Sequence, residues 1–227
     1  MCHVVMSEYI NEMSDLSLLM AISKGQRTAL KELMDRYLDI TSLTAYRILC
    51  DHADSMEVTK KVFINLWKTV LRYDYSMSVE QWLLMKVIGL SRRKLIWNNL
   101  SAFLNADQKL FVQSVPKVDD ADDYVTTQAW EIFCRASFGL APLQRVVYTL
   151  SELDSLSEHA VKVITGLSRN SLHFLFESAK KRVEEELGRF GKVAEYIPYV
   201  SFLKKVRDNQ VDNEKLETEI LYLCTKM

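Results

Sequence analysis

Residues 157–172 read SEHAVKVITGLSRNSL, and this stretch decides the fold. Ser157 can cap a short apolar helix, and Gly166 supplies the turn that ends it. Ser168 can then cap a second helix that runs to about Leu187. Because two helices joined by a short turn with glycine are typical of a helix-turn-helix, we predict that motif in the second half of the chain.

The overall composition predicts that the rest of the chain is helical too. The 227 residues include six glycines and three prolines. In average proteins, glycine and proline together make up roughly 12% of the residues, a much larger share. Turn residues this scarce are unusual in sandwiches and barrels, so we predict an all-α fold. With 48% apolar residues, the chain can bury a core without disulfides. The formal net charge of -1 gives no overall field, so any binding of nucleic acid must come from local patches.

Apolar side chains recur at spacings of three and four through the N-terminal half, which is the period of an α-helix. The predicted helices cover residues 14–24, 27–50, 54–71 and 78–98. Ser14 is the expected N-cap of the first helix. Asp54 and Glu57 have the spacing of a capping box at the start of the third helix. Ser78 and Gln81 have it at the start of the fourth, so we predict a four-helix N-terminal domain.

The helical period fades after the fourth helix, where aspartates crowd residues 119–123 with Lys117 as their basic neighbour. An acidic stretch of this kind is typical of a solvated, flexible linker between two domains. The predicted parts are a helical domain at residues 1–100, a linker at 101–127, a second helical domain at 128–190 and a C-terminal extension at 191–227. The amphipathic stretch at 216–224 is expected to cover the second domain or to recruit a regulator.

The cysteines lie far apart in the sequence, as Cys2, Cys50, Cys134 and Cys224. This isolation excludes a CxxC redox pair or a short metal knuckle and fits buried thiols in a reducing cytosol. Residues 82–90, the most apolar stretch, are about half as long as a membrane span. The N-terminus also lacks the regions of a signal peptide. We therefore expect a cytoplasmic protein without a metal and without membrane insertion.

Known catalytic motifs are missing from the sequence. The histidines, His3, His52, His159 and His173, form no HExxH motif. No serine lies in a GxSxG motif, and no glycine belongs to a GxGxxG or Walker loop. We therefore predict that the protein is not an enzyme, and that it has no catalytic residue and no cofactor.

Basic residues gather locally in the N-terminal half. Residues 14–98 contain thirteen basic and nine acidic side chains, a net charge of +4. Several of these cations lie near Tyr73, Tyr75, Trp82 and Trp97 in the sequence. Cations mixed with aromatic rings suit a single-stranded nucleic acid whose bases stack. The alternative is an ordinary solvated face with Trp82 in the core.

Several segments carry a family resemblance, in a fixed order along the chain. They are KGQRTAL at 24–30, AYRIL at 45–49, LAPLQRVV at 140–147 and AKKRV at 179–183. Together they resemble the extracytoplasmic-function (ECF) group of bacterial RNA polymerase sigma factors, which belong to the sigma-70 family. The first domain is similar to region 2, which melts the promoter, and the second to region 4, a helix-turn-helix. The C-terminal extension has no counterpart in the family pattern.

The resemblance implies a chain that binds core RNA polymerase and promoter DNA and directs promoter recognition and melting in transcription initiation. Its polymerase-binding residues would be Asp51, Asp54, Glu57, Lys60 and Lys61. Its residues for the minus-ten element would be Arg72, Tyr73, Tyr75, Trp82, Lys86, Arg92 and Arg93. Its residues for the minus-thirty-five element would be Ser168, Arg169, Asn170, Ser171, His173, Lys180 and Lys181. Tyr73 and Tyr75 would stack on a base pulled out of the duplex, and an anti-sigma factor would be a further partner.

The chain also departs from the family pattern. Lys162 stands where the family has alanine before the turn, and Leu175 and Glu177 stand where it tends to carry basic residues. These departures favour an alternative, a sigma-fold interaction or regulatory protein that has lost sequence-specific promoter binding. We expect Phe174 and Phe176 in the core, because large apolar side chains seldom face phosphate.

Overall fold

The computed structural model describes residues 14–104, 130, 133–188 and 213–226. Its elements in chain order are α2 (Asp15–Ser23), α3 (Arg27–Leu49), α4 (His52–Thr69), η1 (Val70–Arg72), α5 (Val79–Leu104), α7 (Pro142–Tyr148), η2 (Thr149–Leu153), α8 (Glu158–Thr165), α9 (Arg169–Gly188) and α11 (Asn213–Thr225). A further helix covers residues 133–138. All of these elements are helical, which confirms the predicted all-α class. Because α5 extends to Leu104, the start of the predicted linker is helical, and its remainder, residues 105–127, lies outside the described residues.

Local side-chain caps fix where several helices begin, as the sequence predicts. Ser14 accepts a hydrogen bond from the Ser17 N–H at 3.3 Å ahead of α2. Ahead of α5, the Ser78 hydroxyl accepts from the Gln81 N–H at 3.2 Å. The Gln81 side chain accepts in return from the Ser78 N–H at 3.3 Å. This reciprocal pair is the predicted capping box.

The start of α4 differs from the prediction. Asp51, and not Asp54, is the N-cap, because the Asp51 carboxylate accepts from the Asp54 N–H at 2.8 Å. The helix therefore begins at His52 and places Asp54 in its first turn, where the helix dipole favours a carboxylate. The Asp54 carboxylate is thereby left to contact α5, and Glu57 contacts both α5 and its own helix.

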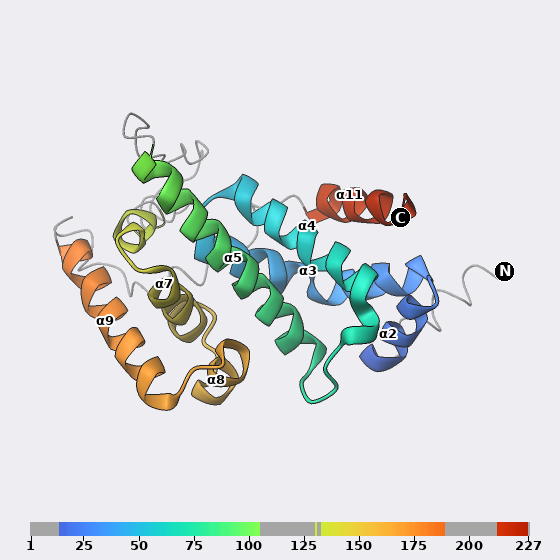
Figure 1. Cartoon of the computed structure of the whole chain (residues 1–227), viewed down its shortest axis with the longest axis horizontal. Helices are drawn as coiled ribbons and strands as arrows, with labels where there is room; N and C mark the ends of the chain where they lie inside the picture. Colours follow the sequence, from blue (N-terminus) through green and yellow to red (C-terminus); the bar gives the residue numbers. More distant parts are fainter. Residues whose placement is uncertain (1–13, 105–129, 131–132, 189–212, 227) are drawn as a thin grey trace, which may run out of the picture.

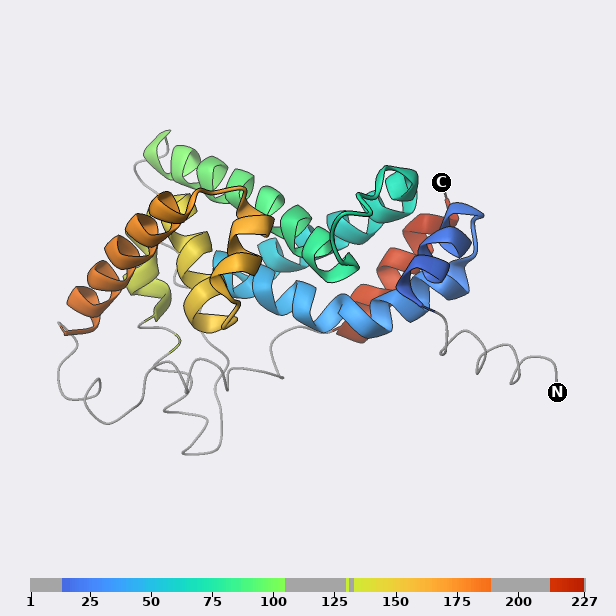
Figure 2. The ribbon, with the colours of Figure 1, turned by 90° about the horizontal axis from the view of Figure 1, so that it is seen from below.

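We call residues 14–104 the N-terminal lobe and residues 133–188 the C-terminal lobe. Figure 1 shows the two lobes side by side, with α5 between α4 on one side and α7 and α8 on the other. The view from below in Figure 2 shows the same packing. Buried side chains of both lobes form one core, which includes Val87 of α5, Val147 of α7 and Val161 of α8. The two predicted domains are therefore packed against each other.

A row of aromatic rings crosses from one lobe to the other. Tyr46 of α3 stacks on Trp130 with ring centroids 5.0 Å apart, and Trp130 contacts Phe133 at 5.2 Å. Phe133 stacks on Tyr148 at 6.1 Å, and Tyr148 stacks on Phe176 of α9 at 6.3 Å. Each such pair contributes about 0.5–1.5 kcal/mol beyond the burial of its surface, so the row stabilises the contact between the lobes.

A buried ion pair also joins the lobes. The Arg47 guanidinium of α3 contacts the Asp154 carboxylate, which follows η2, at 2.5 Å, and the two side chains are 7% and 8% exposed. Thr44 donates to the same carboxylate at 3.0 Å, and Arg47 also donates to the Leu153 carbonyl at 3.2 Å. Burial raises the pKa of Asp154, while Arg47 opposes that rise by favouring the charged form. Because water cannot reach either side chain freely, the stability of each buried charge depends on the other charge of the pair.

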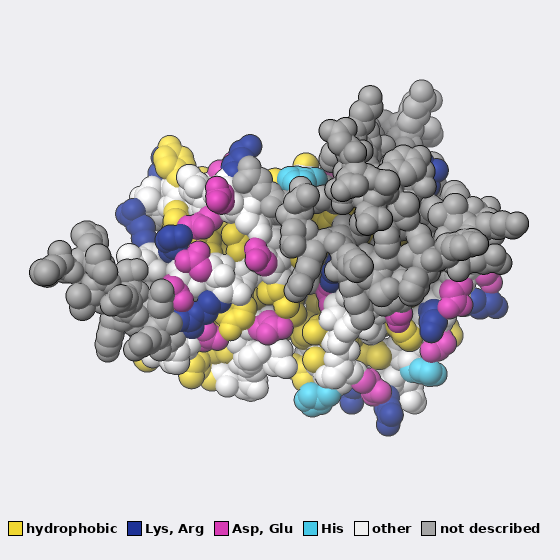
Figure 3. All heavy atoms as spheres, turned by 180° about the vertical axis from the view of Figure 1, so that it is seen from behind, with side chains coloured by type: hydrophobic (Ala, Val, Ile, Leu, Met, Phe, Trp, Pro, Cys, Tyr) yellow, Lys and Arg dark blue, Asp and Glu magenta, His cyan; other side chains and the backbone are white. Residues whose placement is uncertain are grey.

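The C-terminal helix α11 packs on α3 and α4 of the N-terminal lobe, and not on the second predicted domain as the sequence reading allowed. Its buried side chains are Leu216, Ile220 and Cys224. Ion pairs flank this apolar strip, with Lys31 on Glu217 at 2.5 Å and Lys60 on Glu219. On the part of the opposite face where described residues are visible (Figure 3), basic and acidic side chains lie interspersed, which fits paired charges better than an anion-binding surface.

Candidate nucleic-acid interface

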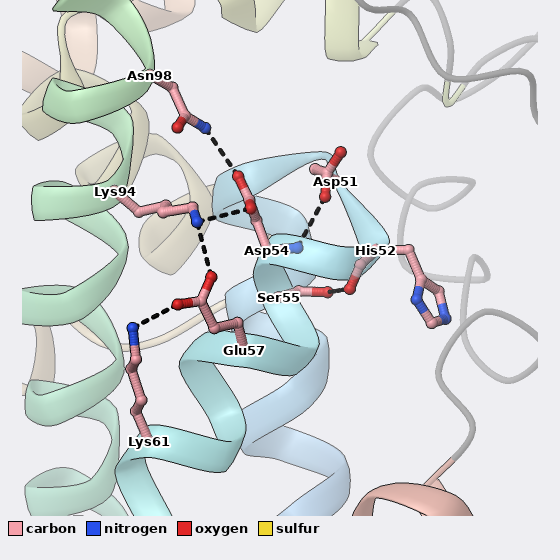
Figure 4. Close-up of polar contacts among 8 residues, drawn as sticks. All are labelled: Asp51, His52, Asp54, Ser55, Glu57, Lys61, Lys94 and Asn98. Atoms are coloured by element: carbon pink, nitrogen blue, oxygen red, sulfur yellow. Dashed lines mark hydrogen bonds and ion pairs between the residues drawn. The ribbon is translucent and has the colours of Figure 1, made fainter. Parts of the chain in front are cut away.

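Asp54 and Glu57, two of the three carboxylates expected to bind polymerase, form one cluster between α4 and α5 (Figure 4). The Lys94 ammonium of α5 contacts Asp54 at 2.9 Å and Glu57 at 2.7 Å. Asn98 donates to Asp54 at 2.8 Å, and Lys61 pairs with Glu57 from one turn along α4. Hydrogen bonds from Lys61 and Lys94 lower the pKa of Glu57 to about 2. These contacts fix α4 against α5.

Two other residues expected to bind polymerase, Asp51 and Lys60, have different partners. The Asp51 side chain caps α4, as described above. Lys60 pairs with Glu219, so α11 occupies the side of α4 that Lys60 faces. Lys61 is 55% exposed and Glu57 43% exposed, so both side chains are accessible from solvent.

Replacing Glu57 with glutamine is expected to remove part of the loss of stability in acid. The folded pKa of about 2 lies below the ordinary value of 4.5, so the native contacts favour the charged form. The stability that Glu57 contributes is therefore present above pH 4.5 and is lost as the pH falls towards 2. Because the side chain is 43% exposed, we expect a contribution at pH 7 below about 1 kcal/mol.

The measurement is the Tm of wild type and of Glu57→Gln by circular dichroism at pH 7 and pH 3. The difference between the two proteins should be larger at pH 7 than at pH 3. A difference that is equal at both pH values would show that Glu57 does not titrate below its ordinary range.

Two aromatic residues expected to face nucleic acid lie in the core instead. Trp82 is 2% exposed and Tyr73 is 6% exposed. Tyr73 is held there because its hydroxyl donates to the Met77 carbonyl and its ring packs edge-on against Trp82 at 5.9 Å. Tyr75 contacts Tyr73 edge-on at 5.1 Å and is 71% exposed. Tyr75 is therefore the exposed aromatic ring of the segment between η1 and α5, and its contact with Tyr73 connects it to the core.

The basic residues of the N-terminal lobe fall into two groups. Those paired with carboxylates include Lys31, Arg36, Arg47, Lys60, Lys61 and Lys94. Arg72, Lys86 and Arg93 are exposed and have no carboxylate partner among the described residues. The Lys86 ammonium lies 4.9 Å from the centroid of the Trp82 ring. Arg92 is half-buried, and within the described structure its Nε has no hydrogen-bond partner.

Lys86, Arg93 and Trp97 lie on one face of α5, and we call these three residues the α5 stripe. Their spacings of seven and four residues correspond to about two turns and one turn of helix. Trp97 is 66% exposed. The family resemblance does not imply a role for Trp97, although its helical spacing from Lys86 is visible in the sequence. The stripe thus places two cations and an indole on one exposed face.

Helices α8 and α9 form the predicted helix-turn-helix. Gly166 ends α8 at φ +69°, a conformation that glycine adopts without strain. Ser168 caps α9 by accepting from the Ser171 N–H at 3.2 Å. The expected minus-thirty-five residues that are exposed here are Ser168, Arg169, Asn170, Ser171 and His173. Arg169 pairs with Glu158 of α8 at 3.1 Å.

Further along α9, the two phenylalanines have different environments. Phe174 is 70% exposed, so the expectation that it lies in the core is wrong. It follows Asn170 by four residues and therefore shares that exposed face. Phe176 is half-buried in the aromatic row, as expected. Lys180 is half-buried, and Lys181 is exposed with a carboxylate 3.9 Å away.

A scan against models of protein families found no match to this chain, and a search among curated proteins found none either. In the described ranges, no helix is long and apolar enough to cross a membrane. The same residues contain no group of three or more histidine, cysteine, aspartate or glutamate side chains that could hold a metal ion. Function is therefore inferred from the exposed charges and rings described above.

Proposed function

We propose that the chain is a cytoplasmic sigma factor of the ECF type, which binds core RNA polymerase and directs promoter recognition and melting. The observation that carries the proposal is the α5 stripe together with Arg72 and Tyr75. Lys86 and Arg93 share an exposed face of α5 with the Trp97 ring, and Arg72 and the exposed Tyr75 lie in the segment just before α5. Such an arrangement suits a single DNA strand, because phosphates pair with the cations while bases stack on the rings.

In this proposal the loop before α5 and the α5 stripe hold the opened minus-ten element. Tyr75 stacks on a base that has left the duplex, and its contact with buried Tyr73 keeps the ring in place. Lys86 and Arg93 hold phosphates about 10 Å apart along the helix. Stacking contributes about 1–3 kcal/mol per base, which offsets the few kcal/mol that unstacking costs.

The helix-turn-helix would read the minus-thirty-five element. The first turn of a recognition helix lies closest to base edges in the major groove, and in α9 that turn carries Arg169, Asn170 and Ser171. Arginine and asparagine side chains can each make two hydrogen bonds to one purine. Phe174 supplies an exposed apolar group one turn later, which suits a thymine methyl.

The α4 cluster of Asp54, Glu57 and Lys61 would dock on core polymerase. Asp54 and Glu57 are held in position by Lys94, so their geometry is fixed before a partner arrives. An anti-sigma factor is a further proposed partner, and it would act by covering one of these surfaces.

A second candidate function is a sigma-fold interaction protein that no longer reads promoters. It is favoured by the surface of α9, where Glu177 and Phe174 are exposed and Arg169 is already paired with Glu158. The exposed carboxylate of Glu177 would repel the phosphates of DNA bound along α9. In this alternative α9 binds a protein, and the DNA contacts of α5 are absent.

The double substitution Lys86→Ala/Arg93→Ala tests the proposal. Binding to a fluorescently labelled single-stranded DNA is measured by anisotropy at several salt concentrations. If both side chains hold phosphates, the slope of log K against log salt should fall by about 1.4, because each contact to a single strand contributes about 0.7. Affinity at low salt should fall as well.

The matched control is Lys24→Ala/Lys68→Ala, which removes the same charge from exposed lysines outside the α5 stripe. It should leave the slope within about 0.3 of that of wild type. Equal slopes for both double variants would mean that the α5 stripe does not contact DNA and would favour the interaction protein.

A further inference from the structure

Two cysteines that are far apart in the sequence meet where the lobes pack. Cys50 ends α3 in a left-handed conformation, at φ 51° and ψ 27°, and its N–H donates to the Tyr46 carbonyl at 2.7 Å. Cys134 lies on the helix at 133–138. Both cysteines are half-buried and pack against the aromatic row that joins the lobes. The two cysteines therefore share one cluster where the lobes pack, and both are partly open to solvent.

Polar groups surround the Cys50 sulfur. It forms a hydrogen bond with the Cys134 thiol and lies 3.8 Å from the Ser137 hydroxyl. The buried Arg145 guanidinium directs its positive charge and a hydrogen bond at the same sulfur. Burial alone would raise the pKa of the Cys50 thiol, but the Cys134 hydrogen bond and the charge of Arg145 outweigh it and bring the pKa below its ordinary value. These groups favour the thiolate, which is the reactive form of cysteine.

We propose that Cys50 and Cys134 are a redox-responsive thiol pair, which hydrogen peroxide oxidises to a disulfide that joins α3 to the helix at 133–138. Cys50 is the attacking residue, because Arg145 and Ser137 surround its sulfur, and Cys134 is the resolving residue. The bond would connect the N-terminal lobe covalently to the C-terminal lobe. This inference is independent of the proposed promoter binding.

The chemistry proceeds in two balanced steps. The Cys50 thiolate attacks one oxygen of the peroxide, the O–O bond breaks, and the departing hydroxide takes up a proton and leaves as water. Cys50 is then a sulfenic acid. The Cys134 sulfur attacks the sulfenic sulfur, the S–O bond breaks, and the hydroxyl leaves as a second water with the Cys134 proton. Two electrons pass from the thiol pair to the peroxide. A dithiol reductant then returns the disulfide to two thiols by thiol–disulfide exchange and is itself oxidised to a disulfide.

The test treats the full wild-type chain with a small excess of hydrogen peroxide and maps its peptides by mass spectrometry without reduction. We expect one cross-linked peptide pair that contains Cys50 and Cys134 and that dithiothreitol separates. Oxidation should also raise the Tm by about 5–15 °C, because the bond restricts the unfolded chain. Iodoacetamide should modify Cys50 faster than Cys224, which is buried in α11.

Variants separate this pairing from other thiol chemistry. Cys50→Ser and Cys134→Ser should each abolish the cross-link and the rise in Tm, whereas Cys224→Ser should leave both unchanged. The proposal is overturned if oxidised wild type contains Cys50 and Cys134 only as free thiols or sulfinic acids, or if either residue is found joined to a different cysteine. The wild-type map decides between these outcomes even if a variant fails to fold.

Discussion

Replacing Asp154 with alanine is expected to lower the free energy of unfolding by about 3–5 kcal/mol. The substitution leaves the Arg47 guanidinium at the contact between the lobes, 7% exposed and without its carboxylate. It also removes the acceptor for Thr44. A buried charge that loses its partner is much more costly than an exposed one, because water cannot replace the lost contact.

Urea unfolding at pH 7, followed by circular dichroism, measures this effect. The control is Glu158→Ala, which breaks the ion pair between Glu158 and Arg169 on the surface. The Glu158 side chain is 46% exposed and the Arg169 side chain 77% exposed. That change should lower stability by less than about 1 kcal/mol. If Asp154→Ala were as mild as Glu158→Ala, the two lobes would not be held together by a buried ion pair in solution.

Replacing Tyr75 with alanine is expected to weaken binding to single-stranded DNA by about 5-fold to 150-fold. This range corresponds to the loss of stacking on one base, about 1–3 kcal/mol. Tyr75→Phe should bind nearly as well as wild type, since stacking uses the face of the ring and not the hydroxyl. Because the Tyr75 side chain is 71% exposed, neither change should alter the Tm by more than a few degrees.

Anisotropy with the same labelled strand measures this affinity. Tyr222→Ala is the matched control, because Tyr222 lies on α11 and is 56% exposed. Its affinity should equal that of wild type. A Tyr75→Ala variant that binds as tightly as Tyr222→Ala would remove Tyr75 from the proposed interface.

Helix boundaries in this chain are predictable where they depend on neighbouring residues. The Ser168 cap and the left-handed Gly166 need only a few residues on either side, and both form as the sequence indicates. The start of α4 is less predictable, because Asp51 and Asp54 are both good N-caps. The three-residue spacing favoured Asp54, whereas the chain uses Asp51.

Side-chain burial at the candidate site depends on contacts that sequence periodicity does not encode. Tyr73 and Trp82 are buried because the Tyr73 hydroxyl reaches the Met77 carbonyl and its ring reaches Trp82. Phe174 is exposed because its face of α9 has no neighbouring element to cover it among the described residues. Apolar character alone predicted the opposite for Phe174.

Contacts between distant segments could not be predicted from the sequence at all. Cys50 and Cys134 meet only because the lobes pack on each other, and their separation in the chain argued against a pair. The amphipathic pattern of α11 indicated a buried face but not its partner. The ion pair between Lys60 and Glu219 shows that this partner is the N-terminal lobe.

Transcription in vitro tests the central claim most directly. The full chain is combined with core RNA polymerase from the same organism and a library of its genomic fragments, and the transcripts are sequenced. Our account predicts promoter-specific transcripts with wild type and their loss with Tyr75→Ala and with Lys86→Ala/Arg93→Ala, while Lys24→Ala/Lys68→Ala remains active. Tight binding to core polymerase without any promoter-specific transcript would contradict it and identify the chain as an interaction protein.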